Sequence, residues 1–231
     1  MIKVSNGIYV HGSFQLEFDF DIAPGQLVAV LGPSGAGKST LLNVLAGFET
    51  LQSGSIVLNQ TEMTDAAPAQ RPISMVFQDN NTFAHLDCWQ NVAIGVSPKL
   101  RLTEDEHVRV DLALRRVGLN ELAHRKPGEM SGGERQRIAL ARALVRDKPL
   151  LLLDEPFAAL GPALRRDMLE LVADLHREKR LTTLMVTHSP EDAQRIADHV
   201  MFVAEGQVRR PMSTHEFFLN TSDIAARTYL G

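Results

Sequence analysis

The stretch Gly-Pro-Ser-Gly-Ala-Gly-Lys-Ser at positions 32–39 constrains the fold of this chain more than any other feature. Two glycines stand five positions apart and are followed by Lys38 and Ser39. The apolar residues 27–31 before them are typical of a buried strand, and residues 40–48 after them carry apolar side chains at helical spacing. A strand, a glycine-rich turn and a helix start direct backbone N–H groups and a positive helix end at one point. The pattern therefore predicts a phosphate-binding loop.

Each residue of this loop has a predicted part in nucleotide binding. Lys38 brings a mobile positive charge to the β- and γ-phosphates, and the Ser39 hydroxyl is placed to hold Mg²⁺. The alternative is a tight glycine-rich turn that binds nothing, but the complete pattern with both flanks favours a nucleotide. The predicted nucleotide-binding residues are Gly32, Pro33, Ser34, Gly35, Ala36, Gly37, Lys38, Ser39 and Thr40.

Composition limits the classes of protein that these 231 residues can form. The formal net charge of −4 argues against a general binder of nucleic acid or membrane surfaces, which is usually basic. The single cysteine, Cys88, excludes an internal disulfide and suits a reducing compartment. No run approaches the roughly 18 apolar residues of a membrane span, and the N-terminus lacks the features of a secretory signal. We expect a soluble cytoplasmic protein, or a soluble subunit of a larger assembly, that binds no nucleic acid.

The first third of the chain predicts strands. Residues 14–22 alternate apolar and polar side chains with strict period two, which indicates a half-buried strand. Short strands are also expected at 2–5 and 55–59, so this region combines a small antiparallel sheet with the strand, loop and helix of the phosphate site. A further strand over 73–77 ends at Gln78.

Beyond Gln78 the pattern changes twice. Strands disappear from about residue 79 to 130, and the region 104–117 carries Val108, Leu112, Leu114 and Val117 at helical spacing, which predicts an inserted helical subdomain. Helix and strand then alternate, which indicates a mainly parallel sheet. The expected helices are 138–146, 163–179 and 190–197, and the expected strands are 150–153, 182–187 and 200–203.

Two carboxylates follow the apolar run 150–153. Open α/β sheets bind ligands in the crevice beyond the carboxyl ends of their strands, where Asp154 and Glu155 should lie. Asp154 can hold Mg²⁺, and Glu155 can polarise an attacking water as a general base. The alternative is an acidic pair at a helix start before Pro156, but the phosphate loop upstream favours the catalytic interpretation.

Two further polar residues follow predicted strands. His188 comes after the strand 182–187, so its side chain should open into the same crevice. Gln78 ends the strand 73–77 and could reach the metal or the water. Either residue taken alone is more often structural than catalytic.

A second anion site is predicted at Ser131, Gly132 and Gly133. These residues stand at the start of a helix, where glycines allow a ligand to approach the backbone N–H groups closely. Ser131 and Glu134 also have the spacing of a capping box, so an ordinary helix start is the alternative.

From end to end, the sequence resembles the ATP-binding subunits of ABC transporters. The five motifs that support this occur in the order of that family, with a helical stretch between the second and the third. They are the Walker A loop at 32–39, the Q-loop at Gln78, the signature at 130–134, Walker B at 150–155 and the switch histidine at His188. The joint match is far more specific than any single motif.

The resemblance implies an α/β fold with a P-loop NTPase core, a mainly parallel sheet, an N-terminal antiparallel β subdomain and an inserted helical subdomain. The chain would be one domain, with its core at 1–78 and 146–231 and the helical subdomain at about 79–145. It would hydrolyse ATP with Mg²⁺. The implied metal residues are Ser39, Gln78 and Asp154, and the implied catalytic residues are Glu155, His188 and Gln78.

The same resemblance implies partners. ATP would lie between the Walker A loop of one subunit and residues 131–133 of the other in a head-to-tail homodimer. Hydrolysis would drive transport through transmembrane permease subunits, which the Q-loop and the helical subdomain contact. A periplasmic solute-binding protein would take part indirectly. The chain would be a peripheral protein at the cytoplasmic face of the inner membrane.

Three positions depart from the family pattern. Glu134 stands where glutamine is usual, and its charge should weaken dimer closure by up to about 1 kcal/mol. Gly161 replaces the D-loop aspartate at a helix N-cap, where glycine costs only a few tenths of a kcal/mol, so the change concerns communication between ATP sites. Tyr9 and His11 compete for the aromatic position that stacks on adenine, and His11 is favoured by its distance from the phosphate loop.

Several stretches look most like the ATPase subunits of thiamine importers, which form one branch of this family. They are residues 74–81, 83–86, 90–91 and 141–146, together with the compact C-terminal tail. The alternatives are an importer ATPase for another small solute or ion, a non-transport ABC ATPase, and a weakly hydrolytic subunit that only clamps ATP. The ATPase does not touch the solute in this family, so its sequence constrains the cargo indirectly.

Overall fold

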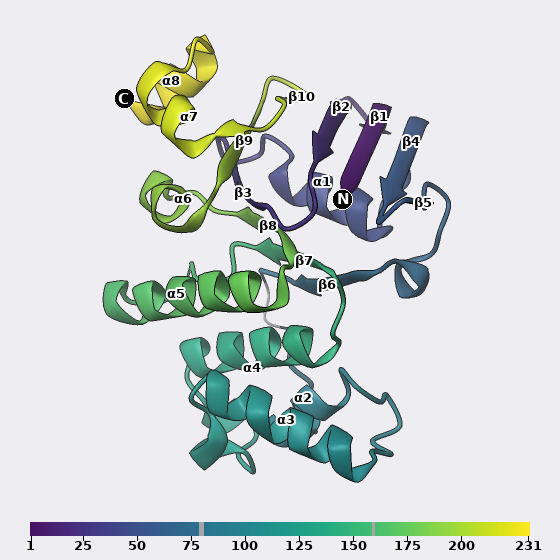
Figure 1. Cartoon of the computed structure of the whole chain (residues 1–231), viewed down its shortest axis with the longest axis vertical. Coiled ribbons are helices and arrows are strands. Elements are labelled where there is room, and N and C mark those ends of the chain that lie inside the picture. The colour runs from purple at the N-terminus through teal and green to yellow at the C-terminus, as the bar shows by residue number, and fades with distance from the viewer. Residues whose placement is uncertain (79–80, 159) are drawn as a thin grey trace.

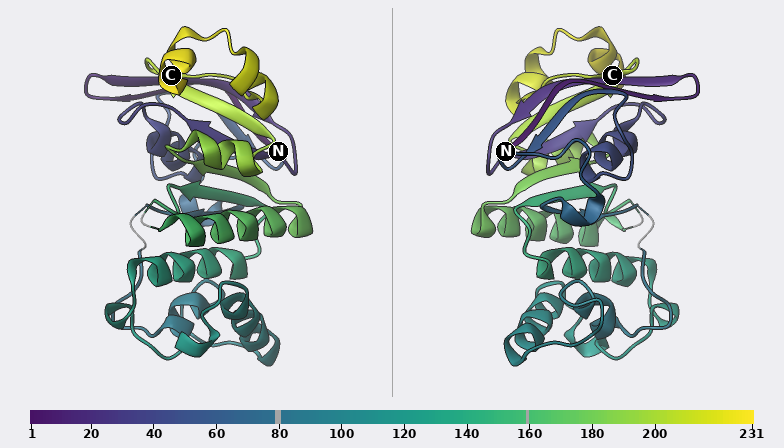
Figure 2. Two further views of the ribbon diagram at one scale, coloured as in Figure 1. Left: turned by 90° about the vertical axis from the view of Figure 1, so that its left-hand side faces the viewer. Right: turned by 90° about the vertical axis from the view of Figure 1, so that its right-hand side faces the viewer.

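The computed structural model describes residues 1–78, 81–158 and 160–231. Asp79 and Asn80, which belong to the stretch 74–81 and to the start of the expected helical subdomain, lie outside the described residues, as does Ala159. The N-terminal strands and the C-terminal helices lie at one end of the molecule and the helical region at the other (Figures 1 and 2). The core strands and α5 lie between these two ends.

The described strands belong to one mixed sheet. They are β1 (Ile2–His11), β2 (Phe14–Ile22), β3 (Leu27–Leu31), β4 (Ser53–Leu58), β5 (Thr61–Glu62), β6 (Ile73–Val76), β7 (Leu150–Asp154), β8 (Thr182–Val186), β9 (His199–Ala204), β10 (Gln207–Val208) and β11 (Met212–Ser213). Their order is β5-β4-β1-β2-β10-β9-β3-β8-β7-β6, with β11 beside β9. The strands β9, β3, β8, β7 and β6 are parallel, whereas β1 is antiparallel to both β2 and β4. This arrangement confirms the predicted fold class.

The helices lie on both faces of this sheet and beyond one of its ends. The α-helices of the described chain are α1 (Lys38–Ala46), α2 (Cys88–Ala93), α3 (Glu104–Arg116), α4 (Gly132–Val145), α5 (Pro162–Lys179), α6 (Pro190–Ile196), α7 (Thr214–Asn220) and α8 (Ile224–Leu230). Single 3₁₀ turns occur at Pro68–Gln70, Asn120–Leu122 and Pro127–Glu129. No described helix is long and apolar enough to span a bilayer.

Strand β1 has 10 residues and is longer than the sequence pattern indicated. It runs to His11 rather than ending near residue 5, and it pairs with β2 along most of its length. Its register shifts against both neighbours around Asn6, whose φ of 47° lies in the left-handed region. Such an irregularity interrupts the period-two alternation, which is why the pattern stops short.

The leucines of β7 divide between two hydrophobic cores. Leu150 and Leu152 belong to the core that α1 completes, whereas Leu151 and Leu153 belong to the core of α4 and α5. Because successive strand residues point to opposite faces, the sheet separates α1 from α4. Figure 1 shows the same separation.

Helix α3 buries a different face from the one that its apolar pattern predicted. Val108 and Leu112 are 51% and 52% exposed, so half of the predicted apolar stripe was wrong. The buried stripe has the i, i+3, i+4, i+7 spacing of a helix face, but it begins at Val110, because this side of α3 faces α2 and α4. It consists of Val110, Ala113, Leu114 and Val117.

Candidate nucleotide site

Four neighbouring strands deliver the predicted site residues to one edge of the sheet. The phosphate loop follows β3, His188 follows β8, Glu155 follows β7 and Gln78 follows β6. The Glu155 N–H donates to the carbonyl of Val186 in β8 over 3.1 Å, which ties the ends of two of these strands together. Because the strands are parallel, their carboxyl ends form one crevice, as expected for an α/β ligand site.

The phosphate loop has glycine where the backbone leaves no alternative. Gly37 has a φ of 102°, and a Cβ there would lie 2.8 Å from Phe14 Cζ. At Gly32 a Cβ would lie 2.1 Å from the Val203 carbonyl oxygen. Glycine therefore allows the loop to pass between a neighbouring strand and the Phe14 ring.

Lys38 is the buried cation of this loop. Its Nζ donates to the carbonyl oxygens of Gly32 and Pro33, each over 2.8 Å, and only 6% of the residue is exposed. Burial lowers the pKa of Lys38, and the charges of Glu155 and Asp154 oppose that shift. The ammonium group is thus held at the loop by two carbonyl oxygens, and the two carboxylates favour its charged form.

Ser39 and Asp154 form the part of the site that suits a divalent cation. Ser39 Oγ donates to Asp154 Oδ1 over 3.0 Å, so β7 and the start of α1 bring two oxygen ligands together. Burial raises the pKa of Asp154, while the Ser39 hydrogen bond and Lys38 lower it. Ser39 and Gln78 both line a cavity of about 410 Å³ beside the phosphate loop. Hydroxyl, carboxylate and amide oxygens are the donors that Mg²⁺ prefers, so the residues fit this ion.

Glu155 and His188 lie side by side, although His188 is not among the described residues that line the phosphate-loop cavity. His188 Nδ1 is 3.5 Å from Glu155 Oε2. Glu155 has a φ of 45°, which is uncommon for a residue with a Cβ and marks a backbone held in place by its surroundings. Glu155 itself lines the cavity of the phosphate loop, beside the space where phosphates would lie.

The signature residues lie apart from this cavity. The described residues that line the cavity do not include Ser131, Gly132 or Gly133, which begin α4 on the other face of the sheet. Ser131 and Glu134 form the predicted capping box, with Ser131 N–H donating to Glu134 Oε2 over 2.7 Å and Glu134 N–H donating to Ser131 Oγ over 3.3 Å. The Ser131 backbone hydrogen bond holds the pKa of Glu134 below its usual range.

The two aromatic candidates differ in exposure, and a third ring lies close to the phosphate loop. Tyr9 is only 6% exposed and its hydroxyl donates to Glu49 over 3.1 Å, so burial removes it as a ring that stacks on adenine. His11 is exposed and is paired across the hairpin with Phe14. Phe14 lines the phosphate-loop cavity. The alternating pattern of its strand predicted Phe14 only as a core residue, so its place at the site was not foreseen.

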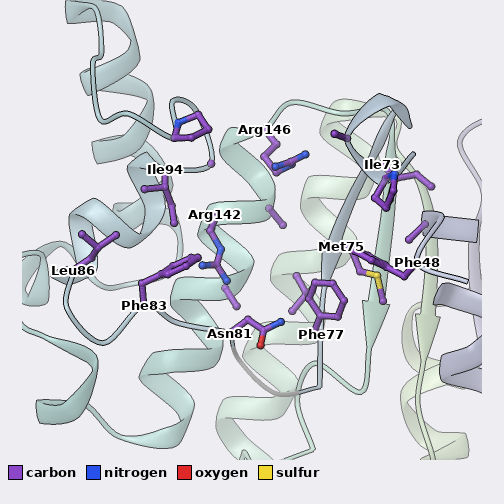
Figure 3. Close-up of a pocket in the computed structure, with 18 of the residues that line it drawn as sticks. Phe48, Ile73, Met75, Phe77, Asn81, Phe83, Leu86, Ile94, Arg142 and Arg146 are labelled. Carbon is purple, nitrogen blue, oxygen red and sulfur yellow. The ribbon is translucent and has the colours of Figure 1, made fainter. Parts of the chain in front are cut away.

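A second large hollow lies between the core and the helical region. Figure 3 shows Phe48, Met75 and Phe77 on one side and Phe83, Leu86 and Ile94 on the other. Its volume is about 710 Å³. We call this hollow the interdomain groove. It carries exposed aromatic rings, with Phe48 54% and Phe83 46% exposed, and Arg142 lies over the Phe83 ring at 5.6 Å.

A residue of the interdomain groove directly precedes a residue of the nucleotide site in the sequence. The Phe77 ring packs edge to face against Phe48 with their centroids 5.5 Å apart, and Phe77 directly precedes Gln78. One residue of the groove, Phe77, is thus the chain neighbour of Gln78. The apolar pattern over 40–48 predicted Phe48 as part of the helix, but α1 ends at Ala46 and the Phe48 side chain is left exposed at the groove.

The comparison with known families identifies the class of protein. The family model described as ABC transporter matches residues 16–158, which contain the phosphate loop, Gln78, the signature and the two carboxylates. The chain therefore belongs to the ABC transporter family.

Individual relatives are similar over the whole chain. The thiamine import ATP-binding protein ThiQ of Mesorhizobium japonicum is 52% identical over 230 residues, which cover 100% of this chain and 91% of that protein. The proteins of the same name from Brucella suis and Salmonella paratyphi A are 50% and 46% identical and are covered to 95% and 96%, with 100% and 98% of this chain aligned.

Two solved structures share the fold. The ATP-binding cassette MJ0796, in a dimeric post-hydrolysis state bound to ADP and Pi, has a TM-score of 0.82 and 28% identity, with 93% of this chain and 99% of that chain covered. The ADP conformation of the cassette MJ1267 has a TM-score of 0.88 and 25% identity, with 100% and 98% covered.

Proposed function

We propose that this chain is the ATP-hydrolysing subunit of a thiamine importer. The observation that supports it most is the full-length similarity, at 46% to 52% identity, to proteins named for thiamine import. The geometry supports the hydrolytic part, since the groups that bind phosphate, metal and water converge at one edge of the sheet.

Each residue of the site has a proposed part in hydrolysis. Lys38 and the loop N–H groups bind the β- and γ-phosphates, while Ser39, Asp154 and Gln78 hold Mg²⁺. The metal would neutralise the charge that develops on the phosphates. Glu155 takes the proton of the attacking water, and His188 contacts the carboxylate and the γ-phosphate side of the site.

The signature residues would complete the site of a second copy. Ser131, Gly132 and Gly133 present a helix N-terminus, which attracts anions, but they lie away from their own phosphate loop. In a head-to-tail homodimer they would face the γ-phosphate bound by the other subunit. The dimeric state of the similar cassette MJ0796 supports this arrangement.

The interdomain groove is the proposed contact with the permease. It is apolar, it carries two exposed aromatic rings and it is open, as a groove that accepts a short amphipathic helix should be. A cytoplasmic helix of the permease in this groove would sense Gln78 through Phe77. The chain would then be peripheral at the cytoplasmic face of the inner membrane, and a periplasmic protein would deliver the solute from the other side.

Uptake in cells tests the proposal. Thiamine uptake should be lost in a strain that lacks this gene and restored by the unaltered chain, but not by Glu155→Gln. If the deletion strain takes up thiamine normally but no longer takes up another small solute, the chain belongs to a different importer. Copurification with no membrane permease would favour a non-transport ATPase.

A weakly hydrolytic clamp is the second candidate, because of Glu134 and Gly161. Gly161 is the N-cap of α5, has no side chain to cap the helix, and stands in the place of the family's D-loop aspartate. The measured turnover of the purified complex separates the two: a clamp binds ATP but leaves it unhydrolysed over many minutes.

A further inference from the structure

Helix α8 contacts the catalytic edge of the sheet through the side chain of Tyr229. The Tyr229 hydroxyl donates to the carbonyl oxygen of His188 over 3.0 Å. The His188 ring in turn lies 3.5 Å from the Glu155 carboxylate. A residue two positions before Gly231 thus contacts the loop that carries a proposed catalytic side chain.

Both ends of α8 are fixed to the core. At its start, Asp223 accepts a hydrogen bond from Ala226 N–H over 3.0 Å and another from Arg209 Nε over 2.9 Å. At its end, the Tyr229 ring packs against Phe202 of β9 with the centroids 5.6 Å apart. Because Phe202 is buried in the core sheet, the Tyr229 hydroxyl has a defined position relative to the strands.

The His188 loop needs a fixed backbone. The His188 side chain is 53% exposed, so packing restricts its ring only weakly. The direction of the ring therefore depends on the position of the His188 backbone. On one side of this loop Thr187 Oγ1 donates to Asp192 Oδ2 and accepts from Ser189 N–H. The Tyr229 hydroxyl binds the carbonyl oxygen of His188, which lies between Thr187 and Ser189. Burial and the Glu155 charge raise the pKa of Tyr229, which agrees with a hydroxyl close to the carboxylate.

We propose that Tyr229 is a positioning residue for ATP hydrolysis. By holding the His188 carbonyl, α8 keeps the imidazole beside Glu155, and the C-terminal tail thereby sets the rate of the chemical step. The inference rests on the proposed function, in which Glu155 and His188 act on ATP. It assigns a role to a segment that carries none of the five motifs.

The substitution Tyr229→Phe tests this role in the complex of the chain with its permease. It removes the hydroxyl and keeps the ring on Phe202. We expect kcat to fall about threefold to tenfold, as loss of one hydrogen bond allows, with KM for ATP within about twofold. Thr228→Val is the matched control, because Thr228 Oγ1 donates to the Ile224 carbonyl within α8; kcat should not change. Melting temperatures should match in both variants.

A double-mutant cycle shows whether Tyr229 acts through His188. In single-turnover measurements, Tyr229→Phe should cause no further loss in a His188→Ala background. Equal losses in both backgrounds, wild-type kcat in Tyr229→Phe, or a lower melting temperature that accounts for its loss of activity would overturn the inference. If the unsubstituted complex itself does not hydrolyse ATP, the proposed function fails first, and that outcome is recognised without any Tyr229 variant.

Discussion

The two halves of the proposed nucleotide site are built in different ways. In the phosphate-loop half, Lys38 and Asp154 are buried, and a hydrogen bond between Ser39 and Asp154 joins two elements far apart in sequence. In the signature half, Ser131 is exposed, and its side-chain hydrogen bond stays within its own capping box. The first half is already assembled in one chain, whereas the second is a helix start that faces outward.

This difference suggests a division of labour. Buried, mutually bonded groups can bind a phosphate and a metal in a single subunit, because the surrounding strands fix their positions. An exposed helix start adds an anion site only when another surface brings an anion to it. Substitutions in the first half should therefore affect the chemistry itself, and those in the second half should affect assembly of the complete site.

The largest effect is expected from Glu155→Gln. It keeps the shape of the side chain but removes the base, so hydrolysis should fall by about 10²- to 10⁴-fold while ATP binding persists. Steady-state hydrolysis and equilibrium nucleotide binding, measured on the same preparation, check this. Unchanged turnover would remove Glu155 as the base and leave the phosphate-loop half as a binding site only.

The next effect is expected from Gly132→Ala in the signature half. A Cβ there has room in the single chain, since the nearest atom is Arg135 Nη2 at 4.0 Å. The melting temperature should therefore stay within about 2 °C, whereas turnover of the permease complex should fall at least about tenfold because a second subunit's phosphate can no longer approach. Gly128→Ala is the control, because a Cβ at that position meets nothing within 4 Å. Equal turnover in both variants would contradict the dimer arrangement.

Phe83→Ser tests the interdomain groove, which lies between the core and the helical region. Copurification of the permease should fall about tenfold, as for loss of an aromatic anchor, while ATP binding by the isolated chain is unchanged. Leu219→Ser on α7 removes an apolar side chain that is also exposed, at 66%, and should leave copurification intact. If the permease copurifies with Phe83→Ser as well as it does with Leu219→Ser, its contact lies elsewhere on the chain.

A smaller gain is expected from Glu134→Gln. The Glu134 carboxylate accepts the Ser131 backbone N–H, and glutamine can do the same, so the melting temperature should hardly change. Removing the negative charge from the helix start should raise turnover by up to about fivefold, which corresponds to about 1 kcal/mol. A marked loss of melting temperature would mean that the charge serves the fold rather than the second half of the site.

Gly161→Asp should have the smallest effect. Gly161 is the N-cap of α5 and a Cβ there meets nothing within 4 Å, so aspartate should fit and add a few tenths of a kcal/mol of stability. The Hill coefficient for ATP, measured in the permease complex, should change while the melting temperature rises slightly. An unchanged Hill coefficient would show that this position does not link the two ATP sites.

Much of this site could be predicted because its motifs are local. The phosphate loop, Glu155 and the Ser131–Glu134 capping box depend on neighbours within a few positions, and the capping box formed as its spacing indicated. The prediction of the buried face of α3 was wrong for two of its four residues, since periodicity alone does not show which neighbours a helix contacts. Phe14 and Phe48 were missed because their roles depend on contacts with distant elements.

The sequence by itself determined the residue types, the phosphate loop and the alternation of strand and helix, because these follow from local backbone preferences and apolar periodicity. Tertiary structure decided the order β6-β7-β8-β3, which places Gln78, Glu155, His188 and the phosphate loop at one edge. It also put the signature on the other face of the sheet and brought Tyr229 to the His188 loop. These are contacts between residues far apart in the chain, and only the packing of one sheet against two hydrophobic cores selects them.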